Sequence, residues 1–341
     1  MYTDYYGLSE PPFQLTPDAR YWFDSRTHKK AMAYLGYGLA QGEGFIAVTG
    51  EVGAGKSTLV AHLLATIDRE RLNAISLVST QVEGDDMLRL VAHGLGLVTH
   101  AAAKADLLDS VERALSEEAR RGRRTLIIVD EAQNLTHSAL EELRMLSNFT
   151  SQGRALVQIF LLGQPEFRDR LAADPSVEQV RQRVIANHHL GPIEAGEVEA
   201  YIVHRLGIAG WDGRPSFRAA TVQALYRHSG GIPRRLNQLA NRLLLFAALE
   251  QLDTIEEAHV ESVAADLAAD RPQAGPANTA STAQAAPARS AEPVRDLALE
   301  RRVAALETQL EEQEKIVRRV LTLLVEWVEN GQQAPGYTHA A

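Results

Sequence analysis

The stretch GEVGAGKST, residues 50–58, constrains the fold more than any other part of the sequence. It lies between the short apolar run FIAVT and the apolar stretch LVAHLLA, a pattern that predicts a strand, a tight loop and a helix. Gly50, Gly53 and Gly55 allow the loop backbone to curl so that its N–H groups point inward, and the start of the helix adds a partial positive charge. The sequence therefore predicts a loop that binds phosphate groups.

The spacing of this loop, G-x-x-x-x-G-K-[S/T], also assigns roles to its last residues. We expect Lys56 to reach the β- and γ-phosphates of a nucleotide and Ser57 to offer its hydroxyl to Mg²⁺. The alternative is a glycine-rich turn with a surface lysine, but the flanking strand and helix favour the phosphate site. The predicted nucleotide-binding residues are Gly50, Glu51, Val52, Gly53, Ala54, Gly55, Lys56, Ser57 and Thr58.

A second motif, TLIIVDEAQ at residues 125–133, ends a buried strand with two carboxylates. Ligands of open α/β sheets bind at the carboxyl ends of the strands, where Asp130 and Glu131 would lie. Asp130 is suited to hold Mg²⁺, and Glu131 to polarise the water that attacks the γ-phosphate. An acidic pair after a strand can also be a simple helix cap. Combined with the upstream loop, it indicates hydrolysis of the nucleotide.

Three further sequence features refine this interpretation. Gln164 follows the fourth apolar run and is placed to sense the γ-phosphate, although it is also a turn residue before a proline. Arg181 and Arg183 precede the fifth run, where an arginine can reach the nucleotide of a neighbouring subunit or form a solvated helix end. Arg234, in GGIPRRLNQ, begins a helix from which it can close over the phosphates, with the neighbouring Arg235 as the alternative. The predicted catalytic residues are Lys56, Asp130, Glu131, Gln164, Arg183 and Arg234.

The apolar pattern predicts an α/β domain followed by a smaller helical domain. Five apolar runs alternate with amphipathic stretches, which predicts a five-stranded parallel sheet covered on both faces. The runs are 45–50, 73–79, 125–130, 156–163 and 186–193. We therefore assign residues 1–194, with an N-terminal extension at 1–44, to the α/β domain and 195–268 to a helical lid.

The composition changes after the lid. Residues 269–295 are rich in Ala, Pro, Ser and Thr and predict a flexible linker. In residues 296–330, apolar residues return at alternating steps of four and three, which favours a coiled coil over a single helix docked on the main body.

Composition excludes several kinds of protein. The net charge of −9 argues against a chain dominated by nonspecific nucleic-acid binding. The absence of cysteine excludes disulfides and thiolate metal sites. The sequence shows neither a secretory signal pattern nor the roughly 18–20 apolar residues of a membrane span. We therefore expect a cytoplasmic chain, with any contact to the inner membrane made through a partner.

Together these motifs resemble the AAA+ ATPases, with Walker A at 50–57, Walker B at 125–131, a sensor at Gln164 and the GxPR motif at 231–234. Two segments closely resemble the ExeA type, general secretion pathway protein A: the N-terminal sequence YYGLSEPPFQLTPDARYWF and the segment DEAQNLTHSALEELRMLSNF. Within it, the N-terminus and predicted coiled coil are most similar to ATPases of exosortase and exopolysaccharide systems. Secretion-pathway members carry a membrane span and periplasmic part after the ATPase domain, and this chain departs from them there.

The resemblance implies ATP and Mg²⁺ as ligands and homo-oligomers formed through the ATPase core, the coiled coil or both. It implies assembly or regulation of a cell-envelope export system, with an inner-membrane or export-system partner. Competing hypotheses are a DNA-binding ATPase of the transposition-accessory type and a slow ATP-dependent switch or scaffold. The resemblance also favours an adenine wall formed by N-terminal residues that the residues alone would equally place in the core: Pro12, Phe13, Pro17, Tyr21, Phe23 and His28.

Overall fold

The computed structural model describes residues 2–78, 83–99 and 103–269. The predicted coiled coil at 296–330, and the predicted linker beyond its first residue, lie outside the described residues. Among the described helices, none combines the length and apolar character of a membrane span.

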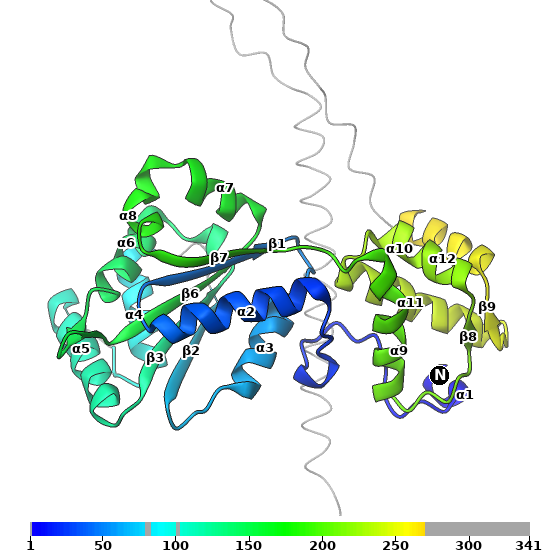
Figure 1. Ribbon diagram of the computed structural model, residues 1–341, viewed down its shortest axis with the longest axis horizontal. Helices are drawn as coiled ribbons and strands as arrows, with labels where there is room; N and C mark the ends of the chain where they lie inside the picture. Colours follow the sequence, from blue (N-terminus) through cyan, green and yellow to red (C-terminus); the bar gives the residue numbers. More distant parts are fainter. Residues whose placement is uncertain (1, 79–82, 100–102, 270–341) are drawn as a thin grey trace, which may run out of the picture. The chain divides into compact units, whose positions relative to one another are not determined.

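A five-stranded parallel sheet forms the centre of the α/β domain, which confirms the predicted fold class (Figure 1). The strand order is β2-β3-β6-β1-β7, and every neighbouring pair is parallel. The strands are β1 (Phe45–Gly50), β2 (Leu72–Val78), β3 (Arg124–Asp130), β6 (Val157–Gly163) and β7 (Val184–Leu190).

Helices cover both faces of this sheet, and the alternation of side chains along each strand supplies two cores. In β1, Phe45 and Ala47 belong to one buried cluster, whereas Ile46 and Val48 belong to the other. The first cluster packs against α4 (Gly84–Gly94), α5 (Lys104–Arg120) and α6 (His137–Leu146), and the second against α2 (Arg26–Gln41) and α3 (Lys56–Thr66). Because both faces of the sheet are buried, each strand must be apolar on both of its faces.

Short elements complete this domain. They are the helices α7 (Pro165–Ala173) and α8 (Glu178–Arg181), and the two-residue strands β4 (Thr150–Ser151) and β5 (Arg154–Ala155), which pair as a small hairpin.

The register places the ends of three neighbouring strands at one edge. Thr49 of β1 pairs with Gly163 of β6, and Val129 of β3 pairs with Leu161. The residues that follow these strand ends therefore meet at the carboxyl edge of the sheet. The start of β7, by contrast, lies opposite Phe45 at the other edge.

Four helices form the helical domain: α9 (Val198–Ile208), α10 (Ala219–Ser229), α11 (Pro233–Leu249) and α12 (Glu257–Ala269). The sequence pattern did not predict the short parallel pair of β8 (Ser216–Phe217) and β9 (Thr254–Ile255), which tethers the start of α10 to the start of α12. Two-residue strands carry too few side chains to produce a detectable alternation.

The first part of the N-terminal segment packs with the helical domain, although the sequence-based boundary assigned residues 1–44 to the α/β domain. Helix α1 (Tyr2–Tyr6) lies beside this domain in Figure 1. The Tyr2 hydroxyl donates to Asn241 Oδ1 at 2.6 Å, and the Tyr6 hydroxyl donates to the carbonyl of Leu252 at 2.8 Å. Phe13 is buried in the same core.

Gln158 of β6 provides a test of how the sheet is joined to α2. Its buried side-chain amide donates to the carbonyls of Gly38 and Glu43, both at 2.8 Å. We expect Gln158→Leu to lower the free energy of unfolding by about 2–4 kcal/mol, because two carbonyls lose their donor.

Thermal denaturation should then show a midpoint lower by about 5–10 °C. Gln182→Leu is the matched control, since the side chain of exposed Gln182 donates to exposed Glu178 alone among the described residues. Equal midpoints for the two variants would contradict this role of Gln158.

Candidate nucleotide site

A cavity of about 310 Å³ opens where the phosphate loop, the N-terminal segment and the helical domain meet. Ten predicted site residues line it: Val52, Gly53, Gly55, Lys56, Ser57, Thr58, Asp130, Glu131, Gln164 and Arg234. The N-terminal segment contributes Leu15, Pro17, Tyr21, Trp22, Phe23 and His28. The helical domain adds Tyr201, Arg205, Pro233 and Asn237 beside Arg234.

The phosphate loop has a backbone that only glycine can follow at two positions. Gly53 and Gly55 have φ angles of +85° and +101°, in the region that other residues rarely adopt. A Cβ at Gly53 would lie 2.3 Å from the Cβ of Arg234, and one at Gly55 would lie 2.7 Å from Nε2 of His28. Arg234 and His28 therefore leave no room for a side chain at Gly53 and Gly55.

Lys56 begins α3 and is buried within the loop. Its ammonium donates to the carbonyl of Gly50 at 2.7 Å and to that of Glu51 at 3.1 Å. Burial lowers the pKa of Lys56, and the carboxylates of Glu131 and Asp130 oppose this shift. The loop carbonyls and the nearby carboxylates together hold a lysine at the place where phosphate charge would be bound.

Ser57 and Asp130 form the candidate Mg²⁺ site. The Ser57 hydroxyl donates to Asp130 Oδ2 at 3.4 Å, so two oxygen ligands lie side by side. Within the described ranges, no group of three or more His, Cys, Asp or Glu side chains is arranged to hold a metal. A pair of oxygens nevertheless suits Mg²⁺, which takes its other ligands from phosphates and water in nucleotide sites.

Glu131 is held in an unusual conformation. Its φ of 57° and ψ of 40° lie in the left-handed region, and its N–H donates to Asp130 Oδ1 at 2.8 Å. Its carboxylate accepts from the amides of Gln133 and Gln164, the latter at 3.1 Å. Gln133 also accepts from the backbone N–H of Gln164 at 3.0 Å. Because this backbone costs energy, the network that holds it points to a functional carboxylate.

The predicted arginines are divided between two edges of the sheet. Arg234 lines the cavity, and its backbone N–H donates to the carbonyl of Gly53 at 3.1 Å, which joins the helical domain to the phosphate loop. Arg183 lies at the amino edge, where it donates to the Ser147 hydroxyl at 3.0 Å. Arg181 is exposed and pairs with Glu178. Neither Arg181 nor Arg183 lines the cavity of its own chain.

The N-terminal residues considered for an adenine wall are divided between the cavity and the core. Pro17, Tyr21, Phe23 and His28 line the cavity, in line with an adenine wall, whereas Phe13 is buried in the helical core.

Several residues of the site were not among the predicted ones. Gln133, which contacts Glu131 and Gln164, lay within the quoted DEAQ motif, and the cavity residue Asn237 lies one helical turn after Arg234, so both had a local signal. Trp22, Tyr201 and Arg205 had none, because only the packing of the N-terminal segment on α9 brings them to the site.

The buried His28 gives the site a pH dependence. Burial lowers its pKa to about 4, partly opposed by Glu197, and its Nδ1 lies 2.6 Å from the Ser25 hydroxyl. An unfolded histidine titrates near pH 6.5, so the unfolded chain binds more protons between about pH 6.5 and pH 4. The stability that comes from burying a neutral His28 is therefore complete above about pH 6.5 and is lost as the pH falls toward 4.

We expect His28 to lower the free energy of unfolding by about 2 kcal/mol as the pH falls from 7 to 5. Thermal denaturation at the two pH values should show a smaller shift for His28→Asn than for the unmodified chain. His93→Asn, at an exposed histidine, is the control and should keep the full shift. An unchanged shift in the His28 variant would exclude His28 as the source.

Comparison with known proteins agrees with this geometry. A family model described as an AAA domain matches residues 39–171. General secretion pathway protein A of Aeromonas hydrophila is 39% identical over 248 residues, which are 72% of this chain and 45% of that protein. The chain thus spans less than half the length of this relative.

Solved structures share the fold. Cdc6p of Pyrobaculum aerophilum aligns with a TM-score of 0.60 at 13% identity, over 75% of this chain and 70% of that chain. The ORC2 protein of Aeropyrum pernix aligns with a TM-score of 0.55 at 15% identity, over 76% and 72%. At these identities the likeness concerns the fold alone. The family match at residues 39–171 and the sheet order together show an AAA+ P-loop fold, and over 248 residues the chain is similar in sequence to general secretion pathway protein A.

Proposed function

We propose that the chain binds Mg-ATP and hydrolyses it to ADP and phosphate, and that this cycle drives assembly or regulation of a cell-envelope export system. The observation that carries the proposal is the convergence of Lys56, Asp130, Glu131 and Arg234 on one cavity. The relationship to general secretion pathway protein A supports the export role. The N-terminal sequence favours exopolysaccharide export among the cell-envelope export systems.

Each residue has a part in this chemistry. The loop N–H groups and Lys56 bind the phosphates, and Ser57 and Asp130 would hold Mg²⁺, which neutralises phosphate charge when bound. Glu131 accepts a proton from the attacking water, while Gln133 and Gln164 keep its carboxylate oriented. Arg234 adds positive charge from the helical domain, so the position of that domain would respond to the nucleotide.

Exchange of Glu131 separates binding from hydrolysis. We expect Glu131→Gln to bind Mg-ATP within about threefold of the unmodified chain and to lose at least about 100-fold in hydrolysis rate, because only the proton acceptor is removed. Lys56→Ala should lose both activities. Binding is measured by calorimetry and hydrolysis by phosphate release. Glu166→Gln is the control, an exposed carboxylate in α7 outside the cavity, and should keep both activities.

Hydrolysis in Glu131→Gln at the rate of the control would refute the assignment of the base. In cells, Lys56→Ala and Glu131→Gln should both abolish secretion of exopolysaccharide, whereas Glu166→Gln should not. Continued secretion by the Lys56 variant would separate the ATPase from export.

Arg183 is proposed to act on the nucleotide of a neighbouring copy. We expect Arg183→Ala and Lys56→Ala each to be inactive alone but to regain part of the activity when mixed, because a mixed pair forms one complete site. The phosphate-release assay should show this rise over a range of protein concentrations. Arg181→Ala, at the neighbouring exposed arginine, is tested in the same way. If no mixture regains activity, neither arginine completes a site in trans.

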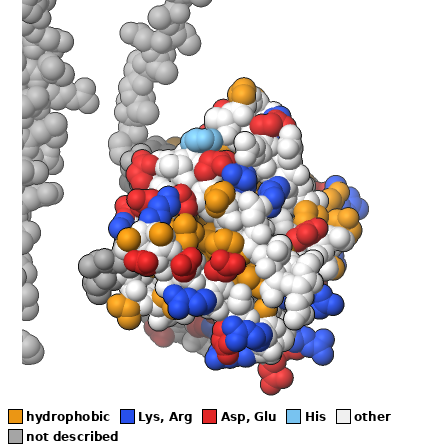
Figure 2. Space-filling model, turned by 90° about the vertical axis from the view of Figure 1, so that its left-hand side faces the viewer, with side chains coloured by type: hydrophobic (Ala, Val, Ile, Leu, Met, Phe, Trp, Pro, Cys, Tyr) orange, Lys and Arg blue, Asp and Glu red, His pale blue; other side chains and the backbone are white. Residues whose placement is uncertain are grey.

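The DNA-binding alternative is weakened by ion pairs. On α5 and the turn that follows it, Arg120 pairs with Glu117 and Arg123 pairs with Glu118, at 3.0 and 2.7 Å, while Arg121 pairs with both glutamates. Figure 2 shows acidic and basic side chains interspersed over the face that it presents. Duplex DNA is bound best by a continuous basic surface, so export remains the preferred assignment.

A further inference from the structure

We infer that Asn237 recognises the nucleobase, and that a buried hydrogen-bond chain from Arg205 through Tyr201 determines which atom of its amide faces the cavity. This inference rests on the proposed function, because it assigns the base end of the same ATP site.

The chain of hydrogen bonds crosses from α9 to α11. Arg205 Nη1 donates to the Tyr201 hydroxyl at 3.1 Å, one helical turn away. The Tyr201 hydroxyl donates to Asn237 Oδ1 at 2.7 Å. The exposed fractions of the three residues are 6%, 4% and 5%, and all three line the cavity. Three polar side chains are thus buried in one wall of a nucleotide site.

The direction of this chain follows from the chemistry of its first member. A guanidinium has only donors, so the Tyr201 oxygen accepts from Arg205 and keeps its own proton to donate. In the part of the chain that the structure describes, Asn237 Oδ1 is the acceptor for that proton. Turning the Asn237 amide over would leave a buried hydroxyl proton without an acceptor, which is costly. The amide is therefore locked with its oxygen toward Tyr201.

The locked amide leaves its NH₂ group as a donor in the cavity wall. Among the described residues, no group accepts a hydrogen bond from Asn237 Nδ2. An adenine ring carries unprotonated nitrogens at positions 1, 3 and 7, which are acceptors. The rings of Tyr21, Trp22 and Phe23 line the same cavity and suit a flat base. A purine with a ring-nitrogen acceptor is therefore the ligand that this wall fits.

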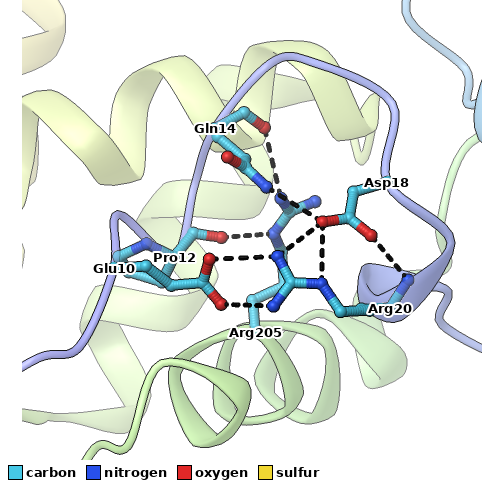
Figure 3. Close-up of polar contacts among 6 residues, drawn as sticks. All are labelled: Glu10, Pro12, Gln14, Asp18, Arg20 and Arg205. Atoms are coloured by element: carbon cyan, nitrogen blue, oxygen red, sulfur yellow. Dashed lines mark hydrogen bonds and ion pairs between the residues drawn. The ribbon is translucent and has the colours of Figure 1, made fainter.

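The same arginine also fixes the N-terminal segment that carries the aromatic lining. Arg205 Nε donates to the carbonyl of Pro12 at 2.7 Å and Nη2 to that of Gln14 at 3.2 Å, as Figure 3 shows. Its guanidinium lies 4.5 Å from the ring centre of Tyr21.

The segment that Arg205 holds is braced by its own charges. Arg20 pairs with Glu10 at 2.9 Å and with Asp18 at 2.7 Å (Figure 3). Because Tyr21, Trp22 and Phe23 follow directly on this braced segment, Arg205 sets the position of the aromatic lining as well as that of the Tyr201 hydroxyl.

The test compares ATP with three analogues that each lack one ring nitrogen, 1-deaza-, 3-deaza- and 7-deaza-ATP, and with tripolyphosphate, which has no base. Binding to the full chain is measured by calorimetry with Mg²⁺. We expect one deaza analogue to bind the unmodified chain about tenfold more weakly than ATP, because one hydrogen bond is lost. In Asn237→Leu, ATP should weaken to the level of that analogue, and the two should then bind equally.

Tyr201→Phe should also weaken the binding of ATP, because it frees the Asn237 amide to turn. Tripolyphosphate should bind to every variant with the same affinity. Gln238→Leu, at the exposed neighbour on α11, is the control and should keep the full preference for ATP.

Equal binding of all three deaza analogues and ATP to the unmodified chain would overturn the inference. An equal loss of affinity for tripolyphosphate and for ATP in the Asn237 variant would also overturn it, since the residue would then act on the phosphates or the fold. In both cases the phosphate site would stand. If the unmodified chain bound neither ATP nor tripolyphosphate, the proposed function itself would fail.

Discussion

Parallel pairing of β1 with β6, and of β6 with β3, is the constraint on which the candidate site depends. In a parallel sheet the carboxyl ends of neighbouring strands lie at one edge. The phosphate loop, the acidic pair and Gln164 each follow one of these strands, so sheet formation alone brings them together. The buried apolar side chains of the strands therefore determine the geometry of a polar site that they do not touch.

The helical domain contributes the other half of the site through a few contacts. The backbone bond from Arg234 to Gly53 places the start of α11 against the phosphate loop. Arg205 holds the N-terminal segment, and the aromatic residues of that segment face the loop from the other side. A nucleotide in the cavity would contact all three parts, and its loss would remove interactions that join them. This arrangement gives a physical route from nucleotide state to domain position.

Hydrogen bonds within the site give the Glu131 carboxylate and the Asn237 amide a defined orientation. Glu131 is restrained by two glutamines, and Asn237 by a tyrosine. An unpaired group at these positions would lose its hydration without compensation. The site is therefore ordered by interactions among its own side chains, in addition to those that would contact a nucleotide.

Much of the sheet and the phosphate half of the site could be predicted because their signals are local. The run FIAVTG coincides with β1, and the loop after it needs glycine at Gly53 and Gly55 for backbone reasons that a short pattern expresses. The base half could not be predicted in the same way. Arg205 meets Pro12 across 193 positions of the sequence, and nothing in either neighbourhood indicates the other.

By itself, the sequence determined the order of strands and helices, the chemistry of the phosphate loop and the acidic pair, because each depends on residues close together in the chain. The tertiary structure alone decided that Tyr2, Tyr6, Leu8 and Phe13 join the helical core, and that Gln164 restrains the carboxylate of Glu131. It also decided that Arg181 and Arg183 lie away from their own cavity. The physical reason is that side chains distant in sequence are brought together only by the packing of whole elements.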